Sequence, residues 1–268
     1  MEDFGLAPVA PVRPVAPYIG GKRVLAKRLA ARIAHVPHRL YAEPFVGLGG
    51  VFFRRTSRPV AEVINDISAD VTTLFRILQR HYQSFLEELK WRLSSRAEFD
   101  RLMRVDPDTL TDLERAARFL YLQRQAFGGK VDSRHFGLTR TNPARFDLTK
   151  LVPMLEDVHE RLAGVVIERL PYADFIRRYD APQTLFYLDP PYHGCEGDYG
   201  MGVFSAADYA RLRDLLGGIQ GCFILSINDT PDVRAVFGDF AIEEVALNYR
   251  LSGTVTPARE LIIAGGGA

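Results

Sequence analysis

Cysteine is scarce in this chain, which argues against the structures that depend on it. Only Cys195 and Cys222 occur among 268 residues, and they fit neither a disulfide framework nor a zinc motif. The six histidines show no His-x-x-x-His spacing, so we expect no metal site. Reduced cysteines are the rule in the cytoplasm, which is the location we expect.

Long apolar runs are missing as well. No run is long enough to cross a bilayer, and the start of the chain lacks the basic residues and apolar core of a signal peptide. We therefore expect no membrane association. The net charge is only +1, so charge alone does not indicate a nucleic-acid partner. With 47% hydrophobic residues, we expect one large domain or one domain with an insertion.

The most informative stretch that is present runs from Leu185 to Tyr192 and reads Leu-Phe-Tyr-Leu-Asp-Pro-Pro-Tyr. Its first four residues have no polar face, which predicts a strand covered on both sides in a parallel sheet. Pro190 and Pro191 cannot donate to a ladder and must end that strand. The corner should therefore lie at the carboxyl end of a strand, where open α/β sheets bind ligands.

This corner combines hydrogen-bond acceptors with an aromatic ring. The proline nitrogens carry no hydrogen, so the carbonyls of Asp189 and Pro190 have no local donor, and the Asp189 side chain adds a carboxylate. Tyr192 adds a flat face beside them. This set suits a planar ring that carries an NH2 group, such as adenine or cytosine. A plain turn with an aromatic plug is the alternative.

Two glycine-rich segments lie earlier in the chain. Gly20, Gly21 and Lys22 precede an expected helix whose start favours an anionic group. Residues 39–52 contain a short apolar segment, a Gly-x-Gly-Gly loop and an expected apolar helix, which is typical of the first βα unit of a nucleotide-binding sheet. The next expected strand ends at Asp66, about 20 residues after the loop, where a carboxylate suits ribose hydroxyls. A helix N-cap is the alternative for Asp66.

Taken in order, four motifs resemble those of the Dam-like adenine-N6 DNA methyltransferases, the alpha group of the amino-methyltransferases. They are Tyr18-x-Gly20-Gly21-Lys22, Glu43-Pro44-Phe45-x-Gly47-x-Gly49, Asn65-Asp66 and Asp189-Pro190-Pro191-Tyr192. The resemblance implies an α/β fold, with a Rossmann-like sheet, helices on both of its faces and a mainly helical target-recognition insertion. It also implies S-adenosylmethionine as the methyl donor and double-stranded DNA as the substrate. It leaves open whether a cognate restriction endonuclease is a partner.

The resemblance also assigns residues. The catalytic corner is Asp189, Pro190, Pro191 and Tyr192. The cofactor site comprises Tyr18, Gly21, Lys22, Glu43, Pro44, Phe45, Gly47, Asp66, Asp174, Phe175 and Asp189. For Asp174 and Phe175, an acid near a helix start followed by a core aromatic is the alternative.

The order of the segments predicts the domain organisation. Residues 1–16 are rich in proline and should form a flexible extended arm. Residues 17–74 and 164–268 should form the catalytic domain, and residues 75–163 the helical insertion.

The insertion is the basic part of the chain. Residues 76–150 hold 15 Lys and Arg against 10 Asp and Glu, a net +5 that leaves −4 for the rest. A basic segment suits DNA phosphates, and a solvated helical face is the alternative. The expected DNA contacts are Arg124, Lys130, Arg134 and Arg140.

We therefore expect a site-specific DNA methyltransferase that flips out an adenine and methylates its N6 amine. One alternative is methylation of another amine: cytosine N4, adenine in RNA, or a glutamine side chain. The other is a catalytically inactive regulator that keeps the cofactor pocket, against which the intact Asp-Pro-Pro-Tyr corner argues.

Overall fold

The protein is built around one mixed β-sheet. The computed structural model describes residues 5–18, 20, 22, 24–131, 134–137, 143–199, 202–251 and 254–267. Over these residues the main sheet has seven strands in the order β5-β4-β2-β6-β7-β9-β8. The strands are β2 (Leu40–Glu43), β4 (Ala61–Asn65), β5 (Val166–Glu168), β6 (Thr184–Leu188), β7 (Cys222–Asn228), β8 (Ala241–Leu251) and β9 (Thr254–Gly266).

The direction of the strands places the site. The first five strands in the sheet order are parallel to one another, and β9 is antiparallel to both β7 and β8. β2 lies between β4 and β6, so the chain leaves β2 toward one side of the sheet and later returns on the other. Such a reversal opens a crevice at the carboxyl ends of the two neighbouring strands.

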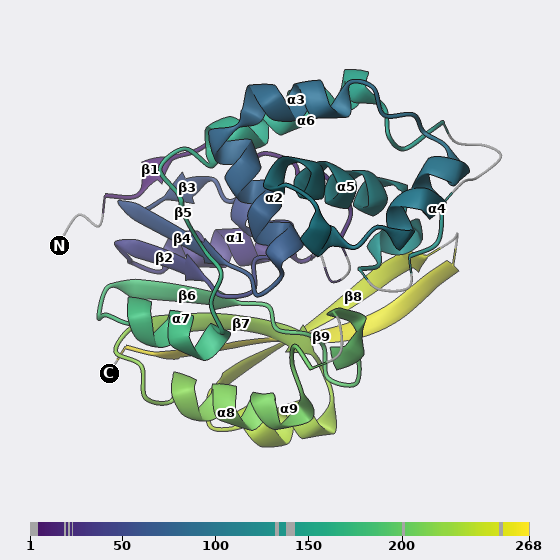
Figure 1. The fold of residues 1–268 in the computed structure, drawn as a ribbon. Coiled ribbons are helices and arrows are strands. Elements are labelled where there is room, and N and C mark those ends of the chain that lie inside the picture. The colour runs from purple at the N-terminus through teal and green to yellow at the C-terminus, as the bar shows by residue number, and fades with distance from the viewer. Residues whose placement is uncertain are drawn as a thin grey trace.

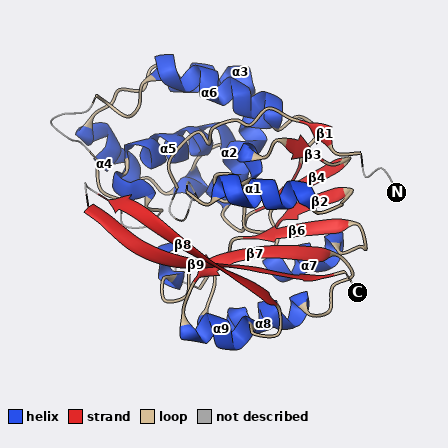
Figure 2. Ribbon diagram, turned by 180° about the vertical axis from the view of Figure 1, so that it is seen from behind, coloured by secondary structure: helices blue, strands red, loops and turns tan. Residues whose placement is uncertain are grey.

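Helices cover both faces of the sheet (Figures 1 and 2). On one side lie α7 (Tyr172–Tyr179), α8 (Ala206–Leu216) and α9 (Pro231–Phe237). On the other lie α1 (Ala26–His35), α2 (Ala69–Arg80), α3 (Tyr82–Leu89), α4 (Arg96–Arg104), α5 (Asp112–Gln125) and α6 (Leu148–Arg161). Short 3-10 turns occur at Phe52–Arg54, Pro107–Thr109, Phe127–Gly129 and Glu196–Tyr199. This arrangement confirms the predicted Rossmann-like α/β fold.

Strand β6 contributes apolar side chains to both faces of the sheet. All five of its residues are buried, including the four from Leu185 to Leu188 for which the sequence predicted it. Because side chains alternate along a strand, Leu185 and Tyr187 enter the core under α1 and α2, whereas Phe186 and Leu188 enter the core under α7 to α9.

The proline-rich arm makes more contacts than its sequence suggested. Ala7 and Pro8 form β1, which pairs with β3 (Ser57–Arg58), and Val15 is completely buried in the core on the α1 side. The expectation of an arm without fixed contacts therefore does not hold for residues 5–16. Apolar residues between the prolines supply the anchors, because Val12 also donates its N–H to Phe53 O at 2.7 Å.

The glycine loop and the start of the inserted helices differ in detail from what the sequence suggested. Only a 3-10 turn, Phe52–Arg54, follows the glycine loop in place of the expected apolar helix, because the chain turns directly into β3. The expected junction after residue 74 falls inside α2, whose buried stripe continues to Leu78. The inserted helices also share one core with the sheet rather than having a core of their own.

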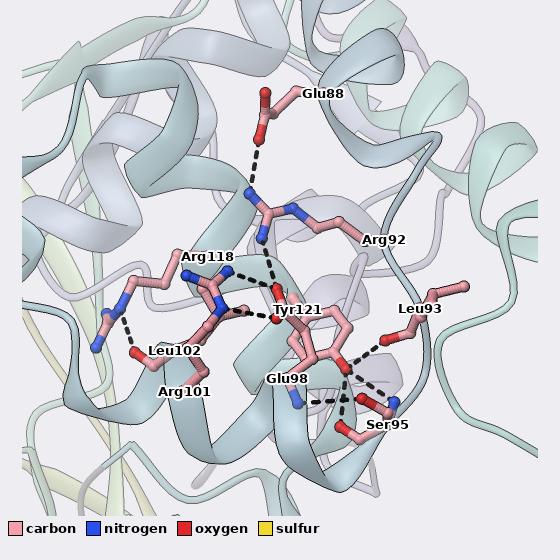
Figure 3. Close-up of polar contacts among 9 residues, drawn as sticks. All are labelled: Glu88, Arg92, Leu93, Ser95, Glu98, Arg101, Leu102, Arg118 and Tyr121. Atoms are coloured by element: carbon pink, nitrogen blue, oxygen red, sulfur yellow. Dashed lines mark hydrogen bonds and ion pairs between the residues drawn. The ribbon is translucent and has the colours of Figure 1, made fainter.

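The inserted helices are joined by polar contacts at the loop before α4 (Figure 3). The Tyr121 hydroxyl donates to Leu93 O at 2.7 Å and accepts from Ser95 N–H at 3.2 Å. Glu98 accepts two hydrogen bonds of 2.8 Å from Arg101. The loop is therefore fixed by α5, although Tyr121 is an aromatic residue of the core. In the described part of the chain, no helix combines the length and apolarity needed to cross a membrane.

Candidate active site

A cavity of about 1500 Å³ lies at the carboxyl ends of β4, β2 and β6. Its walls come from segments that are far apart in the sequence: the arm between residues 13 and 18, the loop between residues 43 and 51, residues 65–68, residues 170–172, and Asp189, Pro191 and Tyr192. Pockets for one small ligand usually hold about 300–1,000 Å³. The cavity therefore has room for more than one small molecule.

The glycine loop is shaped by a close approach of Tyr18. Gly47 has a φ of +50°, and a Cβ added there would lie 2.9 Å from Cε1 of the Tyr18 ring. A side chain at this position would be strained by its backbone and would push the ring away. Gly47 thus lets Tyr18 close one side of the cavity, which brings together two residues that the sequence assigned to the same site.

Asp66 is hydrogen-bonded to this loop. Its carboxylate accepts the N–H of Gly47 at 2.9 Å and the N–H of Ser68 at 2.9 Å. Ser68, not Asp66, is the N-cap of α2 and accepts from Val71 N–H. Burial raises the pKa of Asp66 to about 6, and the two N–H groups oppose that rise. Asp66 lines the cavity, and its two oxygens can still accept further hydrogen bonds.

Three aromatic rings form an apolar part of the cavity wall. Phe45, Tyr172 and Phe204 pack on one another with ring centroids 5.5 to 6.0 Å apart. All three rings line the cavity, and Pro44 lies beside them. Only Phe45 and Pro44 were predicted as site residues. Tyr172 is the first residue of α7, and nothing in the sequence distinguishes it from other aromatic residues at a helix start.

Asp174 and Phe175 do not reach the cavity. Phe175 is completely buried in the core under α7, and Asp174 is exposed and pairs with Arg177 at 3.1 Å. This placement matches the alternative of an acid in the first turn of a helix followed by a core aromatic. The cavity is lined instead by the residues just before this pair, Leu170, Pro171 and Tyr172.

The Asp-Pro-Pro-Tyr corner is linked to Lys22, as its place in the motifs suggested. Lys22 Nζ lies 3.1 Å from Asp189 Oδ1 and 2.5 Å from the Tyr192 hydroxyl, and its side chain is 1% exposed. Lys22 has a φ of +46°, which is uncommon for a residue with a Cβ. Pro190 and Pro191 are buried, and Pro191 O accepts from the Tyr209 hydroxyl at 2.9 Å. The corner is therefore fixed from both sides of the sheet.

The pKa of Asp189 lies near neutral pH. Its burial raises its pKa to about 7, the neighbouring Lys22 opposes this rise, and the charge of Glu260 adds to it. Glu43, on the adjacent strand, is also buried and accepts from the Tyr41 hydroxyl at 2.6 Å. Burial raises the pKa of Glu43 to about 8. Carboxyls with such raised pKa values in a cavity are typical of functional sites.

Glu260 belongs to this corner although the sequence did not place it there. It lies on β9, is 1% exposed, and contacts Lys22 Nζ at 3.1 Å and the Tyr192 hydroxyl at 2.6 Å. A glutamate directly before the apolar run Leu261-Ile262-Ile263 is the signal that could have found it, because a carboxylate in a buried strand needs partners.

Two of the expected DNA contacts, Arg124 and Arg134, bind within the protein. Arg124 donates to Val15 O at 2.9 Å and to Arg145 O at 2.9 and 3.0 Å. Arg134 donates to Gln123 Oε1 at 3.1 and 3.3 Å. Lys130 is exposed. Gly21, a predicted cofactor residue, and Arg140 lie outside the described residues.

These features define the class of the protein. A Rossmann-like sheet whose glycine loop, acidic strand end and Asp-Pro-Pro-Tyr corner share one cavity is that of an amino-methyltransferase. Residues 18–251 match the family model of the D12 class N6 adenine-specific DNA methyltransferases. The match covers most of the chain, so the chain belongs to this family and is an adenine-specific DNA methyltransferase. The predicted family and type of enzyme are therefore confirmed.

Individual relatives agree with this assignment. Type II methyltransferase M1.LlaDCHI of Lactococcus lactis subsp. cremoris is 26% identical over 92% of this chain and 92% of its own length. Type II methyltransferase M.CviBI of Paramecium bursaria Chlorella virus NC1A is 21% identical over 89% of this chain and 92% of its own length. The DNA N-6-adenine-methyltransferase of Escherichia phage P1 is 27% identical over 74% of this chain but only 28% of its own length.

Proposed function

We propose that this enzyme transfers a methyl group from S-adenosylmethionine to the N6 amine of an adenine flipped out of double-stranded DNA in the cytoplasm. The observation that carries the proposal is one cavity that joins two kinds of surface. Asp189 and Tyr192 form an acceptor-and-ring corner, and Asp66 and the glycine loop form a nucleoside-type site. The volume of about 1500 Å³ suits both a donor and a base.

The residues around Asp66 fit the nucleoside part of the donor. Each carboxylate oxygen of Asp66 accepts one backbone N–H, which leaves acceptor capacity for two ribose hydroxyls. The rings of Phe45, Tyr172 and Phe204 would cover the purine. When bound, S-adenosylmethionine supplies a methyl group on a sulfonium with a good leaving group. The protein therefore needs to contribute positioning and electrostatics rather than a covalent intermediate.

The corner fits the amine of adenine. This amine is a weak nucleophile because its lone pair is shared with the ring. The Asp189 carboxylate and the Pro190 carbonyl would accept hydrogen bonds from its two N–H groups and favour a more tetrahedral nitrogen. Tyr192 would stack on the base, which is worth about 1–3 kcal/mol and offsets part of the unpairing cost.

The test is methylation of DNA by the purified enzyme, read by sequencing that detects N6-methyladenine and by nucleoside analysis of digested DNA and RNA. We expect N6-methyladenine in DNA at one short sequence, and none with Asp189→Ala, which should remain folded. N4-methylcytosine, modified RNA, or appreciable turnover by Asp189→Ala would contradict the proposal. The same experiment gives the recognised sequence.

We also propose a role beside a cognate restriction endonuclease, because the first two relatives named above are type II methyltransferases. DNA modified by the enzyme should resist a type II endonuclease that cuts the sequence found by the mapping experiment. Equal cleavage of modified and unmodified DNA would argue against this role.

A further inference from the structure

Glu260 is a buried carboxylate of β9, directly before the apolar run Leu261-Ile262-Ile263. In the sheet it lies opposite Asn228 of β7 and Val245 of β8, so β9 is covered on both edges at this point. Burying a carboxylate costs several kcal/mol unless it is paired and hydrogen-bonded. The partners of Glu260 therefore indicate why the chain keeps it.

Two of those partners belong to the catalytic corner. Glu260 Oε1 accepts from the Tyr192 hydroxyl at 2.6 Å, and Glu260 Oε2 lies 3.1 Å from Lys22 Nζ. Lys22 Nζ is also 2.5 Å from the same hydroxyl and 3.1 Å from Asp189 Oδ1. The hydroxyl thus donates to one group and accepts from another, which fixes the ring about two directions.

The Lys22 ammonium lies close to the hydroxyl of Tyr192. Lys22 Nζ is 4.2 Å from the centre of the Tyr192 ring but only 2.5 Å from its hydroxyl. It therefore lies beside the hydroxyl edge rather than above the middle of the ring. Lys22 and Glu260 therefore contact the ring mainly at its hydroxyl, although the Lys22 ammonium is also within cation–π range of the ring.

We propose that Glu260 is a positioning residue for methyl transfer. Its carboxylate sets the orientation of the Tyr192 ring and holds the Lys22 ammonium against Asp189, so that the stacking surface and the acceptor are in place before the base arrives. Glu260 does so through Tyr192 and Lys22, without touching the base. This inference rests on the proposed function, in which the base stacks on Tyr192.

The test compares Glu260→Gln with Tyr192→Phe. Glu260→Gln keeps the shape but removes the charge, and Tyr192→Phe keeps the ring but removes the hydroxyl that Glu260 holds. We measure the single-turnover methyl-transfer rate, the binding of S-adenosylhomocysteine by calorimetry, and the fluorescence of 2-aminopurine at the target position. The duplex carries the sequence found by the mapping experiment.

Both variants should bind S-adenosylhomocysteine as the wild type does, while methyl transfer slows by about 10- to 100-fold, as expected for a misplaced reacting group. The 2-aminopurine signal should change in both, because the base no longer stacks on a fixed ring. The double variant should be no slower than the slower single variant, since both changes remove the same contact. Glu260→Asp should recover part of the rate. Glu244→Gln is the matched control, because Glu244 lies on the neighbouring strand and is 59% exposed.

Methyl transfer and fluorescence like those of the wild type in Tyr192→Phe would overturn the inference, even if Glu260→Gln fails to fold. So would additive losses in the double variant. Either result leaves the proposed function intact as long as the wild type methylates adenine. Loss of cofactor binding, protein stability and rate together in Glu260→Gln, with a normal Tyr192→Phe, would assign Glu260 a structural role only.

Discussion

Replacing Lys22 by methionine should move the pH dependence of methyl transfer upward. Burial raises the pKa of Asp189 to about 7, and Lys22 is the group that opposes this rise. The ammonium is 3.1 Å from the carboxylate and its side chain is 1% exposed, so solvent screens the pair little. Methionine keeps the length of the side chain and removes the charge.

The size of the shift follows from this contact. An opposite charge at such a distance lowers a carboxyl pKa by about one to three units, and its removal should raise the pKa of Asp189 by that amount. If only the ionised form accepts the amine, half of the wild-type enzyme is active at pH 7. The variant would then hold about a tenth or less of its carboxyl in the ionised form, so kcat/KM should fall at least about fivefold.

The assay is the transfer of labelled methyl groups to DNA, with kcat/KM measured from about pH 6 to 9.5. The acidic limb should move to higher pH in Lys22→Met and stay near its wild-type place in Lys22→Arg. Lys27→Met, on the exposed side of α1, is the matched control. A loss of the same size at every pH would refute the reasoning, because it would show that Lys22 does not act through the ionisation of Asp189.

The remaining predictions concern stability and the coupling of the arm to the insertion. Because the pKa of Asp189 is higher in the folded state, its stability cost grows as pH rises from about 4 to 7; urea unfolding should show Asp189→Asn more stable at pH 8, by up to about 4 kcal/mol, but not at pH 4. Glu62→Gln should cost about 3–5 kcal/mol in the same assay, because Arg161 loses a buried bidentate partner with two contacts of 2.7 Å. Gln123→Leu should cost about 1–3 kcal/mol by thermal unfolding and slow methyl transfer, since it removes hydrogen bonds to Pro17 O and Gly129 O. Gln125→Leu should cost less, because Gln125 Nε2 has no partner among the described residues.

The fold was predictable from local patterns to a large extent. The four apolar residues Leu185 to Leu188 of β6, the prolines that end it, and the acidic residue that follows β4 are signals within a few neighbours, and the structure places these segments as expected. The helix after the glycine loop was not correctly predicted, because whether an apolar segment forms a helix or a turn depends on where the chain must go next.

The site was predictable only in part. Asp66, Lys22 and the Asp-Pro-Pro-Tyr corner belong to family motifs, and Asp66, Lys22, Asp189, Pro191 and Tyr192 line one cavity. Tyr172 and Phe204 have no motif and reach the cavity through tertiary packing. Arg124 has the charge expected of a DNA contact, yet its hydrogen bonds to Val15 O and Arg145 O hold the arm and the insertion together. The sequence shows the charge of a residue but not the groups that it will contact in the fold.

The catalytic corner depends on contacts between opposite ends of the chain. Lys22 and Glu260 are 238 positions apart and meet at 3.1 Å beside Asp189, which lies between them in the sequence. A carboxylate such as Glu260 is costly to bury until its cationic partner is present, so the last strand of the sheet and the segment before α1 should become stable together. The acceptor corner would then be complete only in a chain that has folded from both ends, and partly folded forms would lack the arrangement needed for methyl transfer.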